Sequence, residues 1–143
     1  MKVSLERANE HVHLIARNDD GNELHIDGAE KIGGEGAGFR PMQTLLAALA
    51  GCASMDLVSI LEKQRAGLRH LKITVDGTRP DTTPAPFSAI HLHFSLFGPV
   101  DQSKAERALD LAVNKYCSVG EMLRKSAEIT YSYEILAEDG GEH

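Results

Sequence analysis

Residues 41–67 have the sequence PMQTLLAALAGCASMDLVSILEKQRAG, and this stretch decides how the rest of the chain is arranged. Pro41 suits the first position of a helix, because the N–H that proline lacks has no helical partner there. Gly67 suits the position just after the last turn, in which Lys63 and Arg65 face the negative end of the helix dipole. We therefore predict one long helix over 41–67.

The middle of this predicted helix, from Leu45 to Met55, is apolar or small on every side. A helix that is apolar all round is normally enclosed by other protein. The run is shorter than the roughly 20 residues that cross a bilayer, and Asp56 ends it, so we expect a core helix rather than a membrane span. Cys52 lies inside it beside Gly51, where the missing side chain leaves room for another backbone.

The composition is that of one globular domain, because 143 residues can bury roughly two-thirds of their unfolded surface. The chain has 15 basic and 21 acidic side chains without a basic cluster, which argues against nucleic acid as a partner. Its first residues, MKVSLERANE, lack the apolar segment of a signal peptide, so we predict a cytoplasmic protein. Two cysteines in that compartment are more typical of redox chemistry, metal binding or inert core positions than of a structural disulfide.

Alternating apolar residues predict strands on both sides of the helix. These strands lie around residues 3–5, 12–16, 24–26, 71–75, 90–96 and 129–135. Asp20 and Gly21 predict a hairpin between the second and the third. With two further helices after the fifth strand, the order βββ-α-ββ-αα-β predicts an α+β fold with an antiparallel sheet and segregated helices.

Capping signals predict where the two later helices begin. Asp101 or Ser103 caps the first of them, and Ser103 forms a capping box with a glutamate three residues on. Ser118 and Glu121 form a second box, so that Cys117 falls just before the cap of a short helix. The apolar stripe of the first of these helices consists of Ala105, Leu109, Ala112, Val113 and Tyr116.

Residues 28–40 contain five glycines and predict a mobile loop that leads into the long helix. A phosphate-binding loop is the alternative, because glycines precede a helix here. No lysine follows at P-loop spacing, and no G-x-G-x-x-G lies between a strand and a helix, so the sequence disfavours it.

The two cysteines differ in their local surroundings. Cys117 lies near the first N–H groups of a helix, and the helix dipole there favours a thiolate. Cys52 is in mid-helix and needs a cation from elsewhere in the chain, for which Arg40 is one candidate. Taken alone, either cysteine is better explained as a small buried apolar residue than as a reactive thiol, and their separation along the chain does not predict pairing.

Two pairs of histidines are each spaced by two residues, His11 with His13 and His91 with His93. Residues two apart lie on the same face of a strand, so two neighbouring pairs are able to hold a metal. No carboxylate or cysteine shares this spacing, and we expect the histidines to lie on the outer, solvated face of a sheet.

The segments PMQTLLAALAGCASMDLVSIL and KYCSVGEML resemble the two signature segments of the OsmC/Ohr family, the osmotically inducible and organic hydroperoxide resistance proteins. The strand IHLHFSL and the segment TYSYEI fit the same pattern, and the likeness is closest to the OsmC-like branch. The resemblance implies an OsmC-like α+β fold with antiparallel sheets and two central helices, in an intertwined homodimer.

The resemblance also implies a thiol peroxidase, an antioxidant stress-response enzyme that acts on organic hydroperoxides without metal, haem or other cofactor. Cys52 would attack the peroxide and become a sulfenic acid, which Cys117 would resolve into a disulfide. A lipoyl-type dithiol would reopen that bond. Family members often carry a glutamate after the helix-opening proline, which holds an arginine against the thiolate. Met42 and Gln43 stand there in this chain, while Lys31 and Arg40 are candidates for the cation.

We expect one OsmC-like domain over residues 1–143. Its parts are a strand and loop region at 1–40, the cysteine helix at 41–67, strands and the second cysteine region at 68–137, and a loose tail at 138–143. Because the family glutamate is missing, a non-catalytic protein that binds a small apolar or lipid-like ligand is the alternative function. A metal protein that uses the histidine pairs is a third hypothesis.

Overall fold

The computed structural model describes residues 1–137, and the predicted loose tail at 138–143 lies outside this range. The chain forms two compact units. The first spans Met1–Leu45 and the second begins at Leu46. Each unit has a three-stranded sheet of its own and is described by itself.

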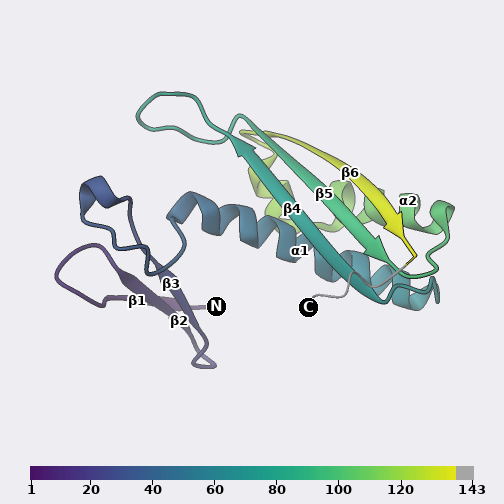
Figure 1. Ribbon diagram of the computed structural model, residues 1–143, viewed down its shortest axis with the longest axis horizontal. Coiled ribbons are helices and arrows are strands. Elements are labelled where there is room, and N and C mark those ends of the chain that lie inside the picture. The colour runs from purple at the N-terminus through teal and green to yellow at the C-terminus, as the bar shows by residue number, and fades with distance from the viewer. Residues whose placement is uncertain (138–143) are drawn as a thin grey trace. The chain divides into compact units, whose positions relative to one another are not determined.

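The first unit is an antiparallel meander of β1 (Val3–Arg7), β2 (Leu14–Asn18) and β3 (Glu23–Ile26), as the alternating pattern predicted (Figure 1). Gly21 has a positive φ of 82° in the turn between β2 and β3, which confirms the predicted hairpin. The glycine-rich segment that follows contains one short 3₁₀ helix, η1 (Glu30–Ile32).

The second unit contains a sheet in the order β4-β5-β6, formed by β4 (His70–Thr78), β5 (Ala89–Phe97) and β6 (Glu128–Leu136). β4 and β5 are antiparallel as predicted, but β6 runs parallel to β5, so this sheet is mixed. Between β5 and β6 the chain passes through α2 (Gln102–Asp110), η2 (Leu111–Tyr116) and α3 (Ser118–Leu123). This long helical crossover returns the chain to the end at which β5 began, which is what a parallel neighbour requires.

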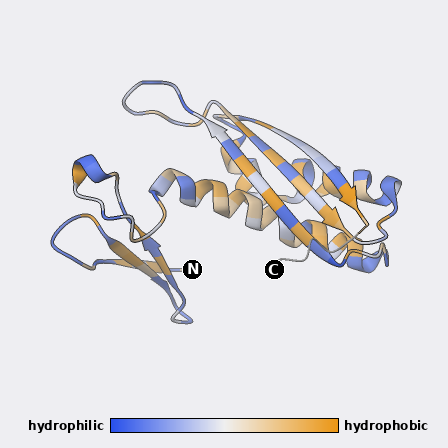
Figure 2. Cartoon of the chain, in the orientation of Figure 1, coloured by the Kyte–Doolittle hydropathy of each residue, from blue (hydrophilic) through white to orange (hydrophobic). Residues whose placement is uncertain are grey.

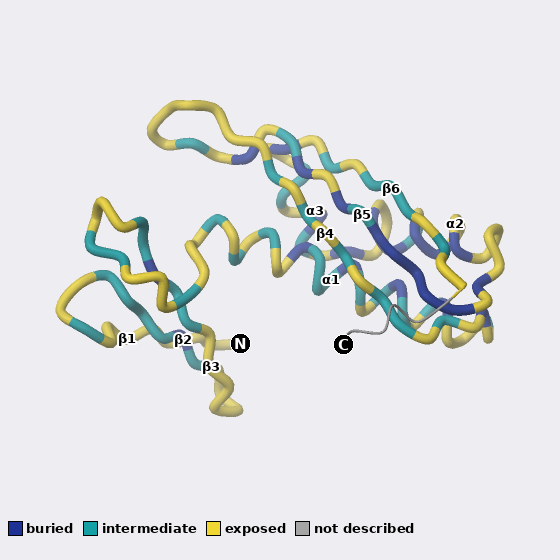
Figure 3. The backbone as a smooth tube through the Cα atoms, viewed as in Figure 1, coloured by how far each residue is buried: buried dark blue, intermediate teal, exposed yellow. Residues whose placement is uncertain are grey.

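The core of the second unit lies between its helices and one face of this sheet. Alternate residues of β5 are buried on that face, and towards its carboxyl end the whole strand is buried (Figure 3). They pack with buried residues of the helices; the set comprises Ile90, Leu92, Phe94, Leu96, Leu49, Ala53, Leu57, Leu61, Ala105, Leu109 and Val113. The α+β fold class predicted from the sequence is therefore confirmed.

The long helix α1 (Pro41–Lys63) begins where proline predicted but ends before Gly67. Arg65 adopts the left-handed conformation with φ of 50°. The N–H of Ala66 bonds to the carbonyl of Leu61, and that of Arg65 to the carbonyl of Glu62, each at 3.0 Å. These two bonds form a Schellman motif, and a non-glycine residue therefore ends the helix.

Only one side of α1 is buried in the single chain, although apolar residues surround its middle (Figure 2). Leu49, Ala53, Leu57 and Leu61 lie on the buried side, whereas Met55 is 76% exposed. By length and composition alone the full helix is able to span a membrane, because the mean hydropathy over its most apolar 18 residues is 1.8. Its buried leucines pack inside protein, which is the property of a core helix.

The later helices begin one or two residues from where the capping boxes predicted. Of the two predicted caps for α2, Asp101 is confirmed, because its carboxylate accepts the N–H of Lys104 at 3.0 Å, and the capping box at Ser103 is not formed. The predicted partner Glu106 instead accepts the Tyr133 hydroxyl at 2.7 Å. Tyr116 is 50% exposed rather than part of the apolar stripe. It ends the π-helix η2, whose wider turns shift the last residues away from the stripe of an α-helix.

Candidate functional site

Cys52 lies in the middle of α1, directly before the buried Ala53, and its side chain is half-buried. The position beside it, Gly51, has open space within 4 Å of where a Cβ would lie. The predicted close approach of another backbone at Gly51 is therefore not made by any of residues 1–137. Cys52 stands at the border between the buried and the open sides of α1.

Cys117 is the N-cap of α3, a position that the capping box had given to Ser118. It has extended dihedrals between η2 and α3, and its Sγ accepts the N–H of Gly120 at 3.2 Å. The π-helix ends at Tyr116, so Cys117 is the residue that leaves helical geometry, and its sulfur takes the role that a hydroxyl usually has. With 3% of its surface exposed, the thiol is buried at a helix N-terminus.

The structure brings the two predicted cysteines together. Burial raises the pKa of the Cys117 thiol to about 11, and the N–H of Gly120 partly offsets this effect. A side-chain hydrogen bond with Cys52, the charge of Cys52 and the charge of Asp56 are smaller contributions to the same raised pKa. Cys117 is therefore a neutral thiol at neutral pH, beside a second thiol and a carboxylate from α1.

Gly120 lies close to the Cys117 sulfur, where an added side chain would make a tight contact. A Cβ at this position would lie 3.3 Å from Sγ of Cys117 and 3.6 Å from Nη2 of Arg124. The guanidinium of Arg124 donates to the carbonyl of Val113 at 2.9 Å and to Glu121 at 3.4 Å. Sequence reasoning gave Arg124 no role, but its spacing of four from a helical glycine places it over the gap that the glycine leaves.

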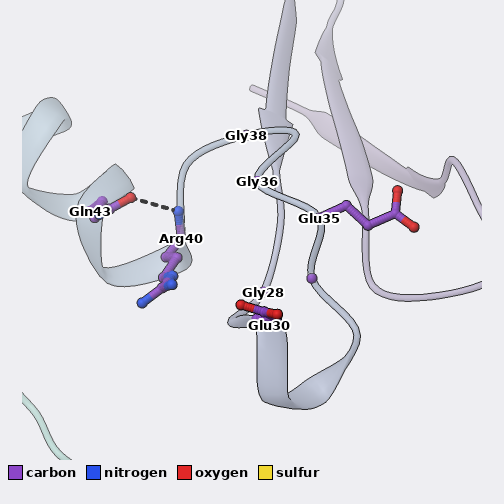
Figure 4. A pocket seen from close by; sticks show the side chains of 8 residues that line it. Gly28, Glu30, Glu35, Gly36, Gly38, Arg40 and Gln43 are labelled. Atoms are coloured by element: carbon purple, nitrogen blue, oxygen red, sulfur yellow. Dashed lines mark hydrogen bonds between the residues drawn. The ribbon is translucent and has the colours of Figure 1, made fainter.

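The other two predicted site residues, Arg40 and Gln43, lie in the first unit. Oε1 of Gln43 accepts the backbone N–H of Arg40 at 2.9 Å, and Oγ1 of Thr44 donates to the carbonyl of Arg40 at 3.1 Å. Gln43 thus supplies half of a capping box for α1 and meets the main chain of Arg40 rather than its guanidinium. Both residues line a cavity of about 720 Å³ together with Glu30, Glu35 and four glycines (Figure 4).

Asp27 organises the glycine-rich loop and was missed by the sequence reasoning. It is 2% exposed, and its carboxylate accepts the N–H groups of Gly28, Glu35 and Ala37 at 2.8, 2.9 and 3.0 Å. The N–H groups of Ala37 and Glu35 hold its pKa below the ordinary value, so it remains charged. The signal in the sequence was an aspartate at the end of a strand, directly before the glycines.

The histidines of β5 form a ladder with hydroxyl and carboxylate groups of β6 on the outer face of the second sheet. The spacings between successive partners are 2.7, 2.8, 2.8, 3.0 and 2.9 Å, and the order is Thr130, His91, Ser132, His93, Glu134 and Ser95. Both ring nitrogens of each histidine are engaged. Within residues 1–137 no three His, Cys, Asp or Glu side chains are arranged to hold a metal ion.

Comparison with known proteins agrees with this architecture. A family model described as OsmC-like protein matches residues 34–132. Protein YhfA of Escherichia coli strain K12 is 40% identical over 98 residues, which cover 68% of this chain and 73% of that protein. A hypothetical protein from Aquifex aeolicus VF5 superposes with a TM-score of 0.83 at 29% identity, covering 96% of both chains.

An organic hydroperoxide resistance protein OsmC from Legionella pneumophila has the same fold, with a TM-score of 0.69 at 20% identity over 94% of this chain and 97% of that one. The family model matches well over half of the sequence, and the resemblance seen in the two cysteine segments is confirmed. The chain therefore belongs to the OsmC-like protein family.

Proposed function

We propose that this chain is a thiol peroxidase that reduces organic hydroperoxides, with Cys52 as the attacking and Cys117 as the resolving thiol. The observation that carries the proposal is the contact between two thiols from distant parts of the chain, one half-buried and one buried. A relative of the same fold is described as an organic hydroperoxide resistance protein. A sulfenic acid formed at Cys52 condenses readily with a neighbouring thiol.

The proposed cycle has three steps. The Cys52 thiolate attacks the terminal peroxide oxygen, which breaks the O–O bond, releases the alcohol and leaves a sulfenic acid. The sulfur of Cys117 then displaces hydroxide, and the Cys52–Cys117 disulfide forms with release of water. A small dithiol of the lipoyl type reduces the disulfide and returns both thiols.

A cation must favour the Cys52 thiolate, because only the thiolate attacks. We assign this role to Arg40, with Lys31 as the alternative. A nearby positive charge favours the thiolate over the neutral thiol, so losing it should slow peroxide attack at neutral pH about tenfold or more. Comparing kcat/KM of Arg40→Met with that of Lys31→Met distinguishes the two.

We also propose that the chain works as a cytoplasmic homodimer. The open side of α1, which includes the exposed Met55, offers apolar surface in the middle of the longest helix. A second copy of α1 is a self-complementary cover for such a surface. Covering this side with protein would also complete the enclosure that its all-round apolar sequence predicts.

The experiment that tests the proposed function follows cumene hydroperoxide consumption with dihydrolipoamide as reductant. Cys52→Ser should abolish turnover, whereas Cys117→Ser should retain one rapid oxidation and accumulate a sulfenic acid that dimedone traps. Turnover that survives Cys52→Ser rules the peroxidase out. Thiols that resist stoichiometric peroxide, together with a ligand retained in native mass spectrometry, would favour the alternative of a small-molecule binder.

A further inference from the structure

The ladder on the outer face of the second sheet joins a serine, a histidine and a carboxylate in that order. Oγ of Ser132 lies 2.8 Å from Nδ1 of His93, and Nε2 of the same ring lies 3.0 Å from Oε2 of Glu134. The hydroxyl of Ser95 donates to the same carboxylate oxygen at 2.9 Å. A hydroxyl and a carboxylate on the two nitrogens of one imidazole are the arrangement that activates a serine nucleophile.

The parallel register of β5 and β6 produces this arrangement (Figure 1). His93 lies directly opposite Ser132, and Glu134 follows two residues later on the same face of β6. The ring of His93 therefore meets Ser132 straight across and Glu134 diagonally. His91 repeats the geometry two residues earlier, with Thr130 opposite it and Ser132 on the diagonal.

Glu134 sets the direction of the hydrogen bonds in the ladder. Hydrogen bonds from His93 and Ser95 lower the pKa of Glu134, so its carboxylate is ionised at neutral pH and only accepts. A neutral His93 must then carry its proton on Nε2, and its Nδ1 is left to accept the hydroxyl proton of Ser132. The Ser132 oxygen in turn accepts the Nε2–H of His91 at 2.8 Å.

Two hydroxyls of β6 meet an imidazole of β5, but their rings differ in the second partner. The ring that faces Ser132 is hydrogen-bonded to the carboxylate of Glu134. The ring that faces Thr130 is hydrogen-bonded to a hydroxyl instead. An adjacent carboxylate orients the imidazole and stabilises the imidazolium that forms when the serine proton is taken up. The geometry therefore favours Ser132 over Thr130 as a nucleophile.

The ladder is accessible from solvent. The side chain of His93 is 38% exposed and that of Glu134 is 47% exposed, while Ser132 is half-buried between its two histidines. Charged residues of β4 face the ladder from the other side of β5; they are Asp76, opposite His91, and Lys72, opposite Ser95. A position on the open face of a sheet suits small reagents whose electrophilic atom reaches the serine oxygen directly.

We propose that Ser132 is a nucleophile that accepts acyl groups from small activated esters, with His93 as its general base and Glu134 as the group that orients the base. The Ser132 oxygen attacks the ester carbonyl carbon while its proton passes to Nδ1 of His93. Attack makes the serine oxygen a poorer acceptor, which frees the Nε2–H of His91 to donate to the developing oxyanion.

The tetrahedral intermediate then collapses. The bond to the leaving alkoxide breaks, and the proton on His93 passes to that oxygen, so the alcohol leaves and the serine is acylated. Water hydrolyses the acyl-serine by the same route and restores the hydroxyl. This reaction uses neither cysteine and is separate from the proposed peroxidase cycle.

Labelling with a fluorophosphonate tests the proposal, because this reagent phosphonylates activated serines irreversibly with loss of fluoride. The parent protein for the test carries Cys52→Ser and Cys117→Ser, so that thiols do not react with the reagents. Peptide mass spectrometry should place the adduct on Ser132, with labelling of Thr130 roughly 100-fold slower. Release of p-nitrophenol from p-nitrophenyl acetate should show the same dependence on Ser132.

Substitutions along the ladder separate the roles. His93→Gln removes the base and should slow labelling about 100-fold, and Glu134→Gln removes the charge that orients it and should slow labelling about tenfold or more. Glu128→Gln, which removes an exposed carboxylate from the same face of β6, should label at the parent rate. The parent rate should also fall in acid, because a protonated His93 no longer accepts the serine proton.

Ser132→Ala should abolish the adduct and the ester turnover that depends on it. Ser132→Thr keeps a hydroxyl and should label measurably, so it provides a second variant if Ser132→Ala folds poorly. An adduct that forms elsewhere than on Ser132, or a labelling rate in folded His93→Gln equal to that of the parent, overturns the inference. Because the parent for this test lacks both thiols, the result is independent of whether the chain is a peroxidase.

Discussion

Substituting alanine for Leu57, on the buried side of α1, and for Met55, on its open side, compares how much each side contributes to stability. Both residues lie in the middle of the same helix, and alanine is at least as good a helix former as either. Leu57 is fully buried, and its truncation removes apolar contacts and leaves a cavity. Such changes cost 2–5 kcal/mol, so we expect Leu57→Ala to lower the free energy of unfolding by about 3 kcal/mol and the melting temperature by about 10 °C.

Met55→Ala should behave differently, because the residue is 76% exposed in the single chain. For an isolated chain the change in stability would stay within about 0.5 kcal/mol. In the proposed homodimer the same side chain is buried by the second copy. Loss of the side chain then weakens the free energy of dimer association by about 1.5–3 kcal/mol, which corresponds to a tenfold or larger increase in the dimer dissociation constant.

Urea denaturation followed by circular dichroism at several protein concentrations, together with sedimentation equilibrium, measures both effects. The Leu57→Ala cost should appear at every concentration, whereas the Met55→Ala cost should be largest in the concentrated samples and should disappear in samples dilute enough for the dimer to dissociate. A cost below about 1 kcal/mol for Leu57→Ala would refute the assignment of the buried side. An unchanged dissociation constant for Met55→Ala would refute a dimer formed through the open side.

Three further changes have outcomes that follow from local geometry. Arg65→Gly should raise the free energy of unfolding by about 1 kcal/mol in chemical denaturation, because Arg65 has φ of 50° at the end of α1. Glu134 forms hydrogen bonds with His93 and Ser95, and these lower the pKa of its carboxyl group. The contribution of Glu134 to stability is therefore present at neutral pH and is lost as the pH falls through that lowered pKa. Glu134→Gln should therefore reduce the fall in melting temperature between about pH 5 and pH 3, and an unchanged acid profile would contradict this. Gly34→Ala should disrupt the loop, since its Cβ would meet the carbonyl oxygen of Gly28, and slow amide exchange at Glu35 in the variant would contradict that expectation.

The parts of the fold that the sequence predicted are those set by local pattern. Pro41 marked the start of α1, and alternating apolar residues placed β4, β5 and β6. The cysteine segments identified the family without any structural information. In each case a short stretch of sequence, or a regular spacing of apolar residues, was enough to predict the element or the family.

The features that escaped prediction depend on parts of the chain that meet only after folding. The direction of β6 follows from where the crossover returns the chain, and no periodicity within the strand contains that information. Cys117 caps α3 because a π-helix ends one residue earlier, and the approach of Cys117 to Cys52 depends on how α1 meets α3. Asp27 was missed because its partners are backbone groups, which every residue carries.

The late pairing of β6 leaves one edge of β5 unpaired while the chain is being synthesised. β5 occupies the centre of its sheet, yet one of its two edges stays open until β6 has left the ribosome. That edge presents free N–H and C=O groups beside the side chains of the most apolar strand, and such an edge recruits strands from other molecules. At about 5–20 residues per second the interval lasts several seconds, which makes nascent chains stalled before β6 the form of this protein most exposed to aggregation.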